Sequence, residues 1–326
     1  MLIRGSLAGK TILVTGGAGF VGSHLVDSLL VEGAAFVAVI DNLFTGSKKN
    51  LSAALATGKV ALYRDDAELS TSLDYIFANH SINVVFNCAT KALNYSFLNP
   101  ANAFDTNVRV ALNLLELQRR GAFKTLCHFS TSEVYGSAIY EPMDEAHPRN
   151  PTTTYAAGKA SADLAVESYQ RMFGVDAFIV RPFNNYGPRQ NHKGILAGVI
   201  PLTAMRLLSG GIPEIHGDGT QSRDFIHVND TVDAVLKLYR SLSSGQTVNI
   251  STDNQITINE LILRICAYYG YTGEISRKEG RKSDVLCHNA DNRKVKELID
   301  YQLTPFDIGL PQTLGWYQAQ LGENGQ

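Results

Sequence analysis

Residues 10–22 read KTILVTGGAGFVG, and this stretch decides the fold. Its first half is rich in β-branched and aliphatic residues, which predicts a buried strand ending near Thr15. A glycine turn of the form G-x-G-x-x-G follows, and the next segment, SHLVDSLLVEG, carries leucines at helical spacing up to Gly33. Strand, glycine turn and helix in this order predict the first unit of a doubly wound α/β sheet.

The glycine turn has the sequence context of a dinucleotide-binding fingerprint, because an acidic residue, Asp41, ends the next apolar run. We expect Gly17 to permit the tight turn, Gly19 to let the backbone approach a pyrophosphate, and Gly22 to let the helix pack on the sheet. The pyrophosphate would meet the amides at the helix N-terminus. A carboxylate at Asp41 would bind ribose hydroxyls and repel a 2′-phosphate, which predicts NAD rather than NADP.

Apolar runs and helical segments alternate up to about residue 182. The further predicted strands are 35–41, 60–65, 82–90, 125–131 and 176–183, with helices that include 111–120 and 160–174. These strands are apolar throughout rather than alternating, as in parallel sheets that are buried on both faces. The fold class is therefore α/β, with a doubly wound parallel sheet.

The pattern changes in PFNNYGPRQNHKG, where Gly, Pro and Asn cluster. Residues 221–239 resemble a return to the main sheet, and residues 247–252 one more strand. We expect a dinucleotide-binding domain made of residues 1–182 with 223–251, and a smaller C-terminal substrate lobe made of 183–222 and 252–326.

Composition excludes several classes of function. The net charge of −2 gives no reason to expect nucleic acid or an anionic membrane as partner. The four cysteines, Cys88, Cys127, Cys266 and Cys287, form no C-x-x-C pair, so neither a metal site nor a disulfide framework is predicted. There is no signal peptide and no apolar run of membrane-spanning length. These features predict a soluble, cytoplasmic protein.

Residues 155–159, YAAGK, place a phenol and an ammonium four residues apart, on one face of a helix. The ordinary pKa of tyrosine is too high for a base at neutral pH, and a nearby ammonium and a cationic nicotinamide would both lower it. Tyr155 could then take a proton from a sugar hydroxyl while a hydride leaves the same carbon, with Lys159 beside it. Thr131, at the end of another predicted strand, could share that hydroxyl. Glu133, two residues further on, is costly to bury unless it is paired or used.

Several motifs in this order resemble the extended short-chain dehydrogenase/reductase family: GGAGFVGSHL, Asp41-Asn42, TSEVYG at 131–136, YAAGK, RPFNNYGPR and SRDFIHVND. Within it the chain is similar to NAD-dependent nucleotide-sugar epimerases, dehydratases and decarboxylases, from about residue 10 to 295. The resemblance implies a Rossmann-type domain with tightly held NAD and a lobe that binds a nucleotide diphosphate sugar. It also implies a homodimer formed through the helices near 111–120 and 161–173.

The resemblance implies roles for residues at matching positions. Thr131, Tyr155 and Lys159 would carry out oxidation at C4 of the sugar. Asn184, Arg223 and, as a second arginine, Arg281 would hold the sugar nucleotide, and Val199, Ile200 and the turn at His216-Gly217 would pack its base. The implied NAD-binding residues are Gly16, Gly17, Gly19, Phe20, Val21, Gly22, Asp41, Asn42, Asp65, Ala89, Tyr155 and Lys159.

Two segments depart from the family pattern. Residues 87–90, Asn-Cys-Ala-Thr, stand where the family often has His-Leu-Ala-Ala, and Asp65-Asp66 replaces an aspartate followed by an apolar residue.

Glu133 and Ser132 bear on the reaction that follows C4 oxidation. In 4,6-dehydratases a glutamate matching Glu133 removes the C5 proton, and many of them have an aspartate at the position of Ser132 that protonates the leaving hydroxyl. Sugar-acid decarboxylases also carry Thr-Ser-Glu, whereas 4-epimerases usually have a small residue in place of Glu133. The segment LFTGSKKN resembles decarboxylases and epimerases, and KGILAGVIP resembles epimerases. A nucleotide-hexose 4,6-dehydratase is the leading hypothesis, and a UDP-glucuronate-type decarboxylase or a 4-epimerase is the alternative.

Two hypotheses from other classes remain. One is a non-catalytic protein that binds NAD and a sugar nucleotide, which the complete set of Thr131, Tyr155 and Lys159 disfavours. The other is an ordinary alcohol dehydrogenase, which Asn184 and Arg223 disfavour.

Overall fold

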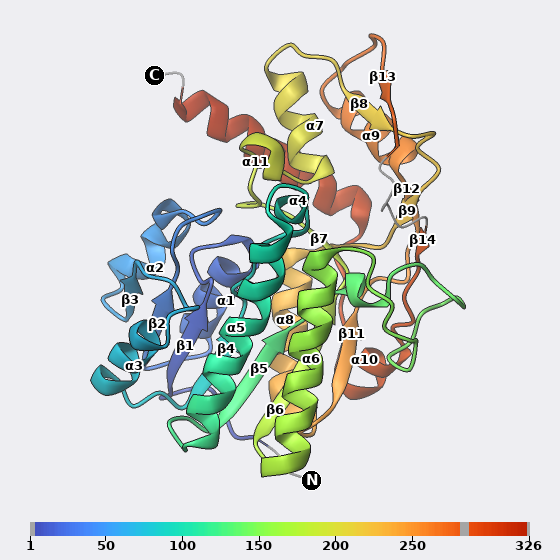
Figure 1. The fold of residues 1–326 in the computed structure, drawn as a ribbon. Coiled ribbons are helices and arrows are strands. Elements are labelled where there is room, and N and C mark those ends of the chain that lie inside the picture. The colour runs from blue at the N-terminus through green and yellow to red at the C-terminus, as the bar shows by residue number, and fades with distance from the viewer. Residues whose placement is uncertain (1–3, 281–286, 325–326) are drawn as a thin grey trace.

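The computed structural model describes residues 4–280 and 287–324, and a seven-stranded sheet lies at its centre (Figure 1). The strand order is β11-β6-β5-β4-β1-β2-β3, and all neighbouring strands are parallel. Their bounds are β1 Thr11–Thr15, β2 Phe36–Ile40, β3 Val60–Tyr63, β4 Val84–Asn87, β5 Thr125–Phe129, β6 Asp176–Pro182 and β11 Thr247–Ile250. The order reverses between β1 and β4, where doubly wound sheets bind their ligands. The predicted fold class is confirmed.

Helices cover both faces of this sheet. On one face α5 (Pro100–Arg119) and α6 (Thr154–Phe173) lie side by side, and on the other α1 (Phe20–Val31) packs beside α8 (Val228–Ser241) (Figure 1). The shorter helices in the first half of the chain are η1 Lys48–Leu51, α2 Ser52–Ala56, α3 Ser70–Asn79 and α4 Leu93–Ser96. Of these, α4 lies against α5, α6 and the smaller lobe (Figure 1).

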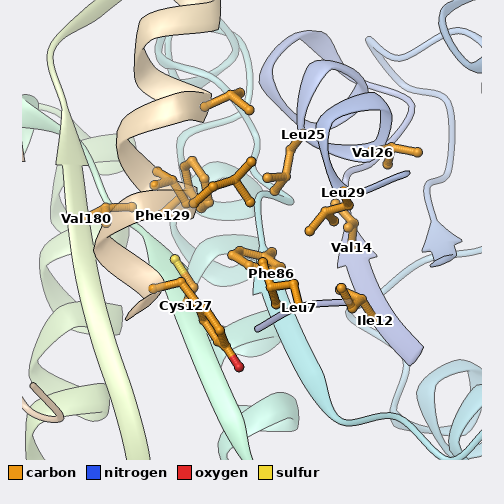
Figure 2. Close-up of a cluster of buried hydrophobic side chains, with 14 of the residues drawn as sticks. Leu7, Ile12, Val14, Leu25, Val26, Leu29, Phe86, Cys127, Phe129 and Val180 are labelled. Atoms are coloured by element: carbon orange, nitrogen blue, oxygen red, sulfur yellow. The ribbon is translucent and has the colours of Figure 1, made fainter. Parts of the chain in front are cut away.

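The two faces bury separate hydrophobic clusters. Val14 of β1 belongs to the cluster under α1 and α8, whereas its neighbour Leu13 belongs to the cluster under α5 and α6. The leucines that predicted the first helix, Leu25 and Leu29, lie in the first cluster with Phe86 of β4 (Figure 2). Each fully buried aliphatic side chain of this size contributes about 1.5–3 kcal/mol. Burial on both faces explains why the strands are apolar throughout.

Most of the remaining segments form a smaller lobe at the carboxyl edge of the sheet, whereas α10 packs against β11 and α8 (Figure 1). Its core contains Ile200, Leu261 and Leu314, from three different helices. The elements outside the main sheet in this half of the chain are β7 Asn184–Tyr186, η3 Gly194–Leu196, α7 Val199–Leu208, β8 Glu214–His216, β9 Ser222–Arg223, β10 Phe225–His227, β12 Ile256–Thr257, α9 Ile258–Tyr268, β13 Ser276–Lys278, β14 Cys287–His288, α10 Arg293–Leu298 and α11 Phe306–Asn324. No helix among residues 4–280 and 287–324 is long and apolar enough to cross a membrane.

The segment 221–239 corrects one prediction. Its strand, β10, pairs with β7 and not with the main sheet, and only the helix α8 returns to cover that sheet. The carboxylate of Asp224 explains the detour, because it accepts hydrogen bonds from the amides of Thr252 and Asp253 just beyond β11. These bonds tie the start of β10 to the edge of the lobe.

Candidate active site

The first turn of α1 packs directly against the backbone of the glycine turn that precedes it. Gly16 adopts a positive φ of 67°, and a Cβ there would lie 2.8 Å from the Cα of Ala89. A Cβ on Gly22 would lie 2.2 Å from the carbonyl oxygen of Gly16. The left-handed turn therefore belongs to Gly16, and the role predicted for Gly17 was wrong: a Cβ on Gly17 would collide with the side chain of Val39 at 2.7 Å.

A cavity of about 280 Å³ opens beside this turn at the carboxyl edge of the sheet. Nine of the predicted cofactor residues line it: Gly16, Gly19, Phe20, Val21, Gly22, Asp41, Asn42, Asp65 and Ala89. Gly19 caps α1 without a side-chain hydrogen bond, so no side chain competes with a ligand for the amides of the first turn. Free amides at a helix N-terminus suit a pyrophosphate, and the cavity residues fit a dinucleotide.

Asp41 connects the fingerprint turn to the loop that follows β2. It is 8% exposed, and its carboxylate accepts hydrogen bonds from the amides of Ala18 at 2.9 Å and Leu43 at 2.8 Å. Burial raises the pKa of Asp41, and these amides partly offset the rise. The loop is fastened at a second point, since the amide of Ser47 and the side chain of Asn50 both donate to the carbonyl of Ala18.

Sequence reasoning missed several residues that line the cavity, among them Phe44, Thr45, Lys91, Gln190 and Leu196. Lys91 is the charged residue among these. It is 8% exposed, and its Nζ lies 4.0 Å from the ring centroid of Phe44. A cation directly after a central strand was the available signal, because such positions face the crevice at the carboxyl edge of the sheet.

Tyr155, Lys159 and Thr131 meet at the end of β5. Thr153 caps α6 through the amide of Ala156, which places Tyr155 in the first turn and Lys159 one turn later. The hydroxyl of Thr131 lowers the pKa of the Tyr155 phenol, so the two side chains lie close together. Lys159 is buried and donates to the carbonyl of Phe129 at 2.8 Å. The structure thus brings together the three residues predicted to act at one carbon.

Burial shifts both ionisable groups of this pair. It raises the pKa of Tyr155 to about 12, against hydrogen bonds to Thr131 and Thr90 that lower it. Burial also lowers the pKa of Lys159 to about 8, against the nearby Asp163 carboxylate and the Cys88 thiol, which raise it. At neutral pH Lys159 therefore stays charged, while Tyr155 needs further positive charge or hydrogen bonds before it can act as a base.

Glu133 lies in the first turn of η2 (Ser132–Tyr135), directly after Thr131. It is half-buried, and its negative charge is near enough to raise the pKa of Tyr155. Ser132 is 2% exposed. Glu133 therefore lies within electrostatic range of Tyr155, two residues after Thr131.

A buried polar network lies next to Tyr155 and Lys159, between α6 and the sheet. Asp163, on α6 one turn beyond Lys159, binds the guanidinium of Arg181 at 2.8 Å and accepts a hydrogen bond from Ser130 at 2.9 Å. All three residues are at most 5% exposed. Asn87, one of the departures from the family pattern, lies between Thr15 at 2.7 Å and His128 at 3.1 Å in the same layer.

The predicted substrate residues are more scattered. Asn184 and Arg223 lie on either side of Asp224: Asn184 bonds to the carbonyl of Asp224 through its amide and its side chain, and Arg223 precedes it. Val199 begins α7 and packs into the core of the lobe, next to the buried Ile200. His216 ends β8 in the outer part of the lobe (Figure 1). Arg281 lies outside the described residues.

Comparison with known proteins agrees with this geometry. The model of a family described as the NAD dependent epimerase/dehydratase family matches residues 12–251. A UDP-glucose 4-epimerase from Mycolicibacterium smegmatis is 32% identical over 89% of this chain and 92% of its own length. UDP-glucuronic acid decarboxylase 3 from Arabidopsis thaliana is 33% identical over 89% of this chain and 84% of its own.

A solved structure represents the third activity, that of a 4,6-dehydratase. A dTDP-glucose 4,6-dehydratase from Streptomyces venezuelae, crystallised with NAD bound, superposes with a TM-score of 0.91. It is 29% identical to this chain, and the match covers 96% of this chain and 98% of the other.

Proposed function

Because the chain belongs to the NAD-dependent epimerase/dehydratase family, we propose that it oxidises C4 of a nucleotide-linked hexose and then eliminates water across C5 and C6. The observation that carries this proposal is Glu133, which follows Thr131 by two residues and is near enough to Tyr155 for its charge to raise the pKa of the phenol. C4 and C5 are bonded neighbours, so a base close to the group that serves C4 is also within reach of the C5 proton. A nucleotide-sugar 4,6-dehydratase needs that second base.

The glycine turn, the first turn of α1 and Asp41 would hold NAD, which supplies the acceptor and later the donor of a hydride. Tyr155 takes the proton of the C4 hydroxyl. The Lys159 ammonium and the Thr131 hydroxyl stabilise the phenolate that does so.

Glu133 acts once C4 is a ketone, because the carbonyl acidifies the C5 hydrogen. The carboxylate takes that proton while the C6 hydroxyl leaves. Ser132 offers only a hydroxyl, which is a weak acid. Glu133 carries the proton that it has taken from C5, so Glu133 is the side chain that can protonate the departing C6 oxygen.

Decarboxylation of a nucleotide-linked uronate is the second candidate. It is favoured by Ser132, because loss of carbon dioxide from a keto acid leaves no hydroxyl to protonate, and by the similarity to a UDP-glucuronic acid decarboxylase. A 4-epimerase, the third activity among the relatives, has no use for a base at C5.

The test is mass spectrometry of the sugar nucleotide after incubation of the protein with NAD and a panel of UDP-, dTDP-, GDP- and CDP-sugars, uronates included. Loss of one water from a hexose supports the proposal. Loss of carbon dioxide from a uronate establishes the second candidate, and an unchanged mass with a new retention time establishes epimerisation.

Glu133→Gln separates the two half-reactions with nearly no change in shape. We expect the variant to form NADH from substrate and to stop at the 4-keto sugar, which the same mass spectra detect. Normal turnover by this variant would rule out Glu133 as the C5 base.

A further inference from the structure

A second cavity, of about 490 Å³, adjoins the dinucleotide cavity, and residues 44–46 line both. Its walls come from the loop that follows β2, from residues 189–196 of the smaller lobe and from α11. A cavity of this volume is large enough for a small ligand. The side chains that line it and do not line the dinucleotide cavity include Lys49, Arg189, His192, Lys193, Trp316 and Gln320.

The two cavities differ in charge. Among the described residues, the dinucleotide cavity is lined by three carboxylates and one ammonium. The second cavity is lined by three cationic side chains, Lys49, Arg189 and Lys193, and by no carboxylate that the structure describes. The balance of charge therefore favours an anion in the second cavity.

Arg189 is held in place with donors to spare. Its Nη1 pairs with Asp27 of α1 at 2.7 Å, whereas a guanidinium carries five N–H donors in a planar fork. One carboxylate accepts at most a bidentate pair of them, so the others remain for a ligand in the cavity. A fork of this kind matches the oxygens of a phosphate.

Strained backbone marks the same cavity. Leu43 and Arg189, which both line it, have φ angles of 60° and 65°. In the part of the chain that the structure describes, three non-glycine residues have a positive φ, and these are two of the three. Such strain persists where the surrounding contacts enforce it, and it gathers at ligand sites. Here the contacts come from outside the cavity, since Asp41 binds the amide of Leu43 and Asp27 pairs with Arg189.

Trp316 gives the cavity an aromatic wall. It is the single tryptophan of the chain and lies half-buried on α11. The ring of His192 stands edge-on to it, with the ring centroids 6.2 Å apart. Aromatic side chains stack on the bases of nucleotides, whereas arginine and lysine bind their phosphates. An aromatic wall beside cationic side chains therefore suits a nucleotide better than a simple anion.

We propose that this cavity is a second ligand site, in which Arg189 and Lys193 bind the phosphates of a nucleoside diphosphate and Trp316 packs against its base. The first-turn residues of α1 that suit the pyrophosphate of NAD line only the dinucleotide cavity, so both ligands can be bound at once. The proposal goes beyond the proposed function, because it does not depend on which reaction follows C4 oxidation.

The test is isothermal titration of the NAD-saturated protein with ADP, followed in parallel by the fluorescence of Trp316. We expect ADP to bind and to change this fluorescence. Lys193→Met should weaken binding about tenfold, and so should Arg189→Lys, which keeps the charge but loses the fork. Lys59→Met is the control, because it removes the same charge from an exposed side chain before β3, at the opposite edge of the sheet, and should change nothing.

Several results would overturn the proposal. ADP that binds only when NAD is absent occupies the dinucleotide cavity instead. ADP binding that is lost in Arg223→Ala and kept in Lys193→Met belongs to the predicted sugar-nucleotide site. Inorganic pyrophosphate that binds as tightly as ADP shows that Trp316 contributes nothing to a base. Because ADP binding needs no turnover, a protein that binds ADP here and dehydrates no sugar refutes only the proposed function.

Discussion

Replacing Gly22 by alanine tests whether the close contact between α1 and the glycine turn holds the cofactor site together. In an ordinary helix this substitution stabilises the protein by about 0.5–1 kcal/mol. Here the added Cβ would lie 2.2 Å from the carbonyl oxygen of Gly16, which is 0.8 Å inside the 3.0 Å that real Cβ contacts reach. The neighbouring atoms belong to backbone, so the helix must move away from the turn.

Overpacking of this kind costs about 1–3 kcal/mol, which exceeds the helical gain, so we expect a net destabilisation of about 1–2 kcal/mol. A displacement approaching 1 Å also moves the first-turn amides away from a pyrophosphate. We expect NAD to bind about 100-fold more weakly.

Isothermal titration with NAD and urea unfolding of the NAD-free protein measure the two effects. Gly5→Ala is the control, because a Cβ there meets nothing within 4 Å and should change neither quantity. A Gly22→Ala variant that is more stable than the wild type and binds NAD equally well would refute the reasoning.

Three further substitutions test other parts of the site. Tyr155→Phe should abolish NADH formation from every sugar while NAD still binds, and retained oxidation would remove the phenol from the mechanism. Arg181→Met leaves the buried Asp163 carboxylate without its cation and should cost about 3–5 kcal/mol in urea unfolding. Loss of Arg181 raises the pKa of Asp163 further. The loss of unfolding free energy is therefore greatest above the pKa that Asp163 has in the variant, and it shrinks as the pH falls through that pKa. A loss of stability that does not depend on pH would contradict this account. Asp41→Ala should weaken the binding of NAD about tenfold and the binding of NADP less, as measured by titration with both dinucleotides. An unchanged preference for NAD over NADP would place the adenine ribose away from Asp41.

The fold was predictable because each of its signals is local. The strand, glycine turn and helix of residues 10–31 are contiguous, and the apolar strands report burial on both faces without reference to their partners. The pairing of Tyr155 with Lys159 was predictable for the same reason, since positions four apart share a helical face.

Predictions that depended on contacts between distant segments were less complete. The return of residues 221–239 was expected as part of the main sheet, but the carboxylate of Asp224 binds amides beyond β11 and diverts β10 to β7. The tight turn was assigned to Gly17 because the motif begins there, whereas the positive φ occurs at Gly16. Lys91 was passed over because nothing near it in the chain shows that Phe44 lies across its ammonium.

The sequence by itself determined the doubly wound sheet, the place of the cofactor turn, and the presence of Tyr155, Lys159 and Thr131, because hydrophobic period and short motifs act over a few residues. Only the tertiary structure decided which distant side chains meet behind the catalytic helix. Ser130, Asp163 and Arg181 come from the end of β5, from α6 and from β6, and they meet because α6 packs on the sheet beside these strands. A hydrogen bond tolerates only a few tenths of an ångström in length, and the packing of whole helices on the sheet sets that distance.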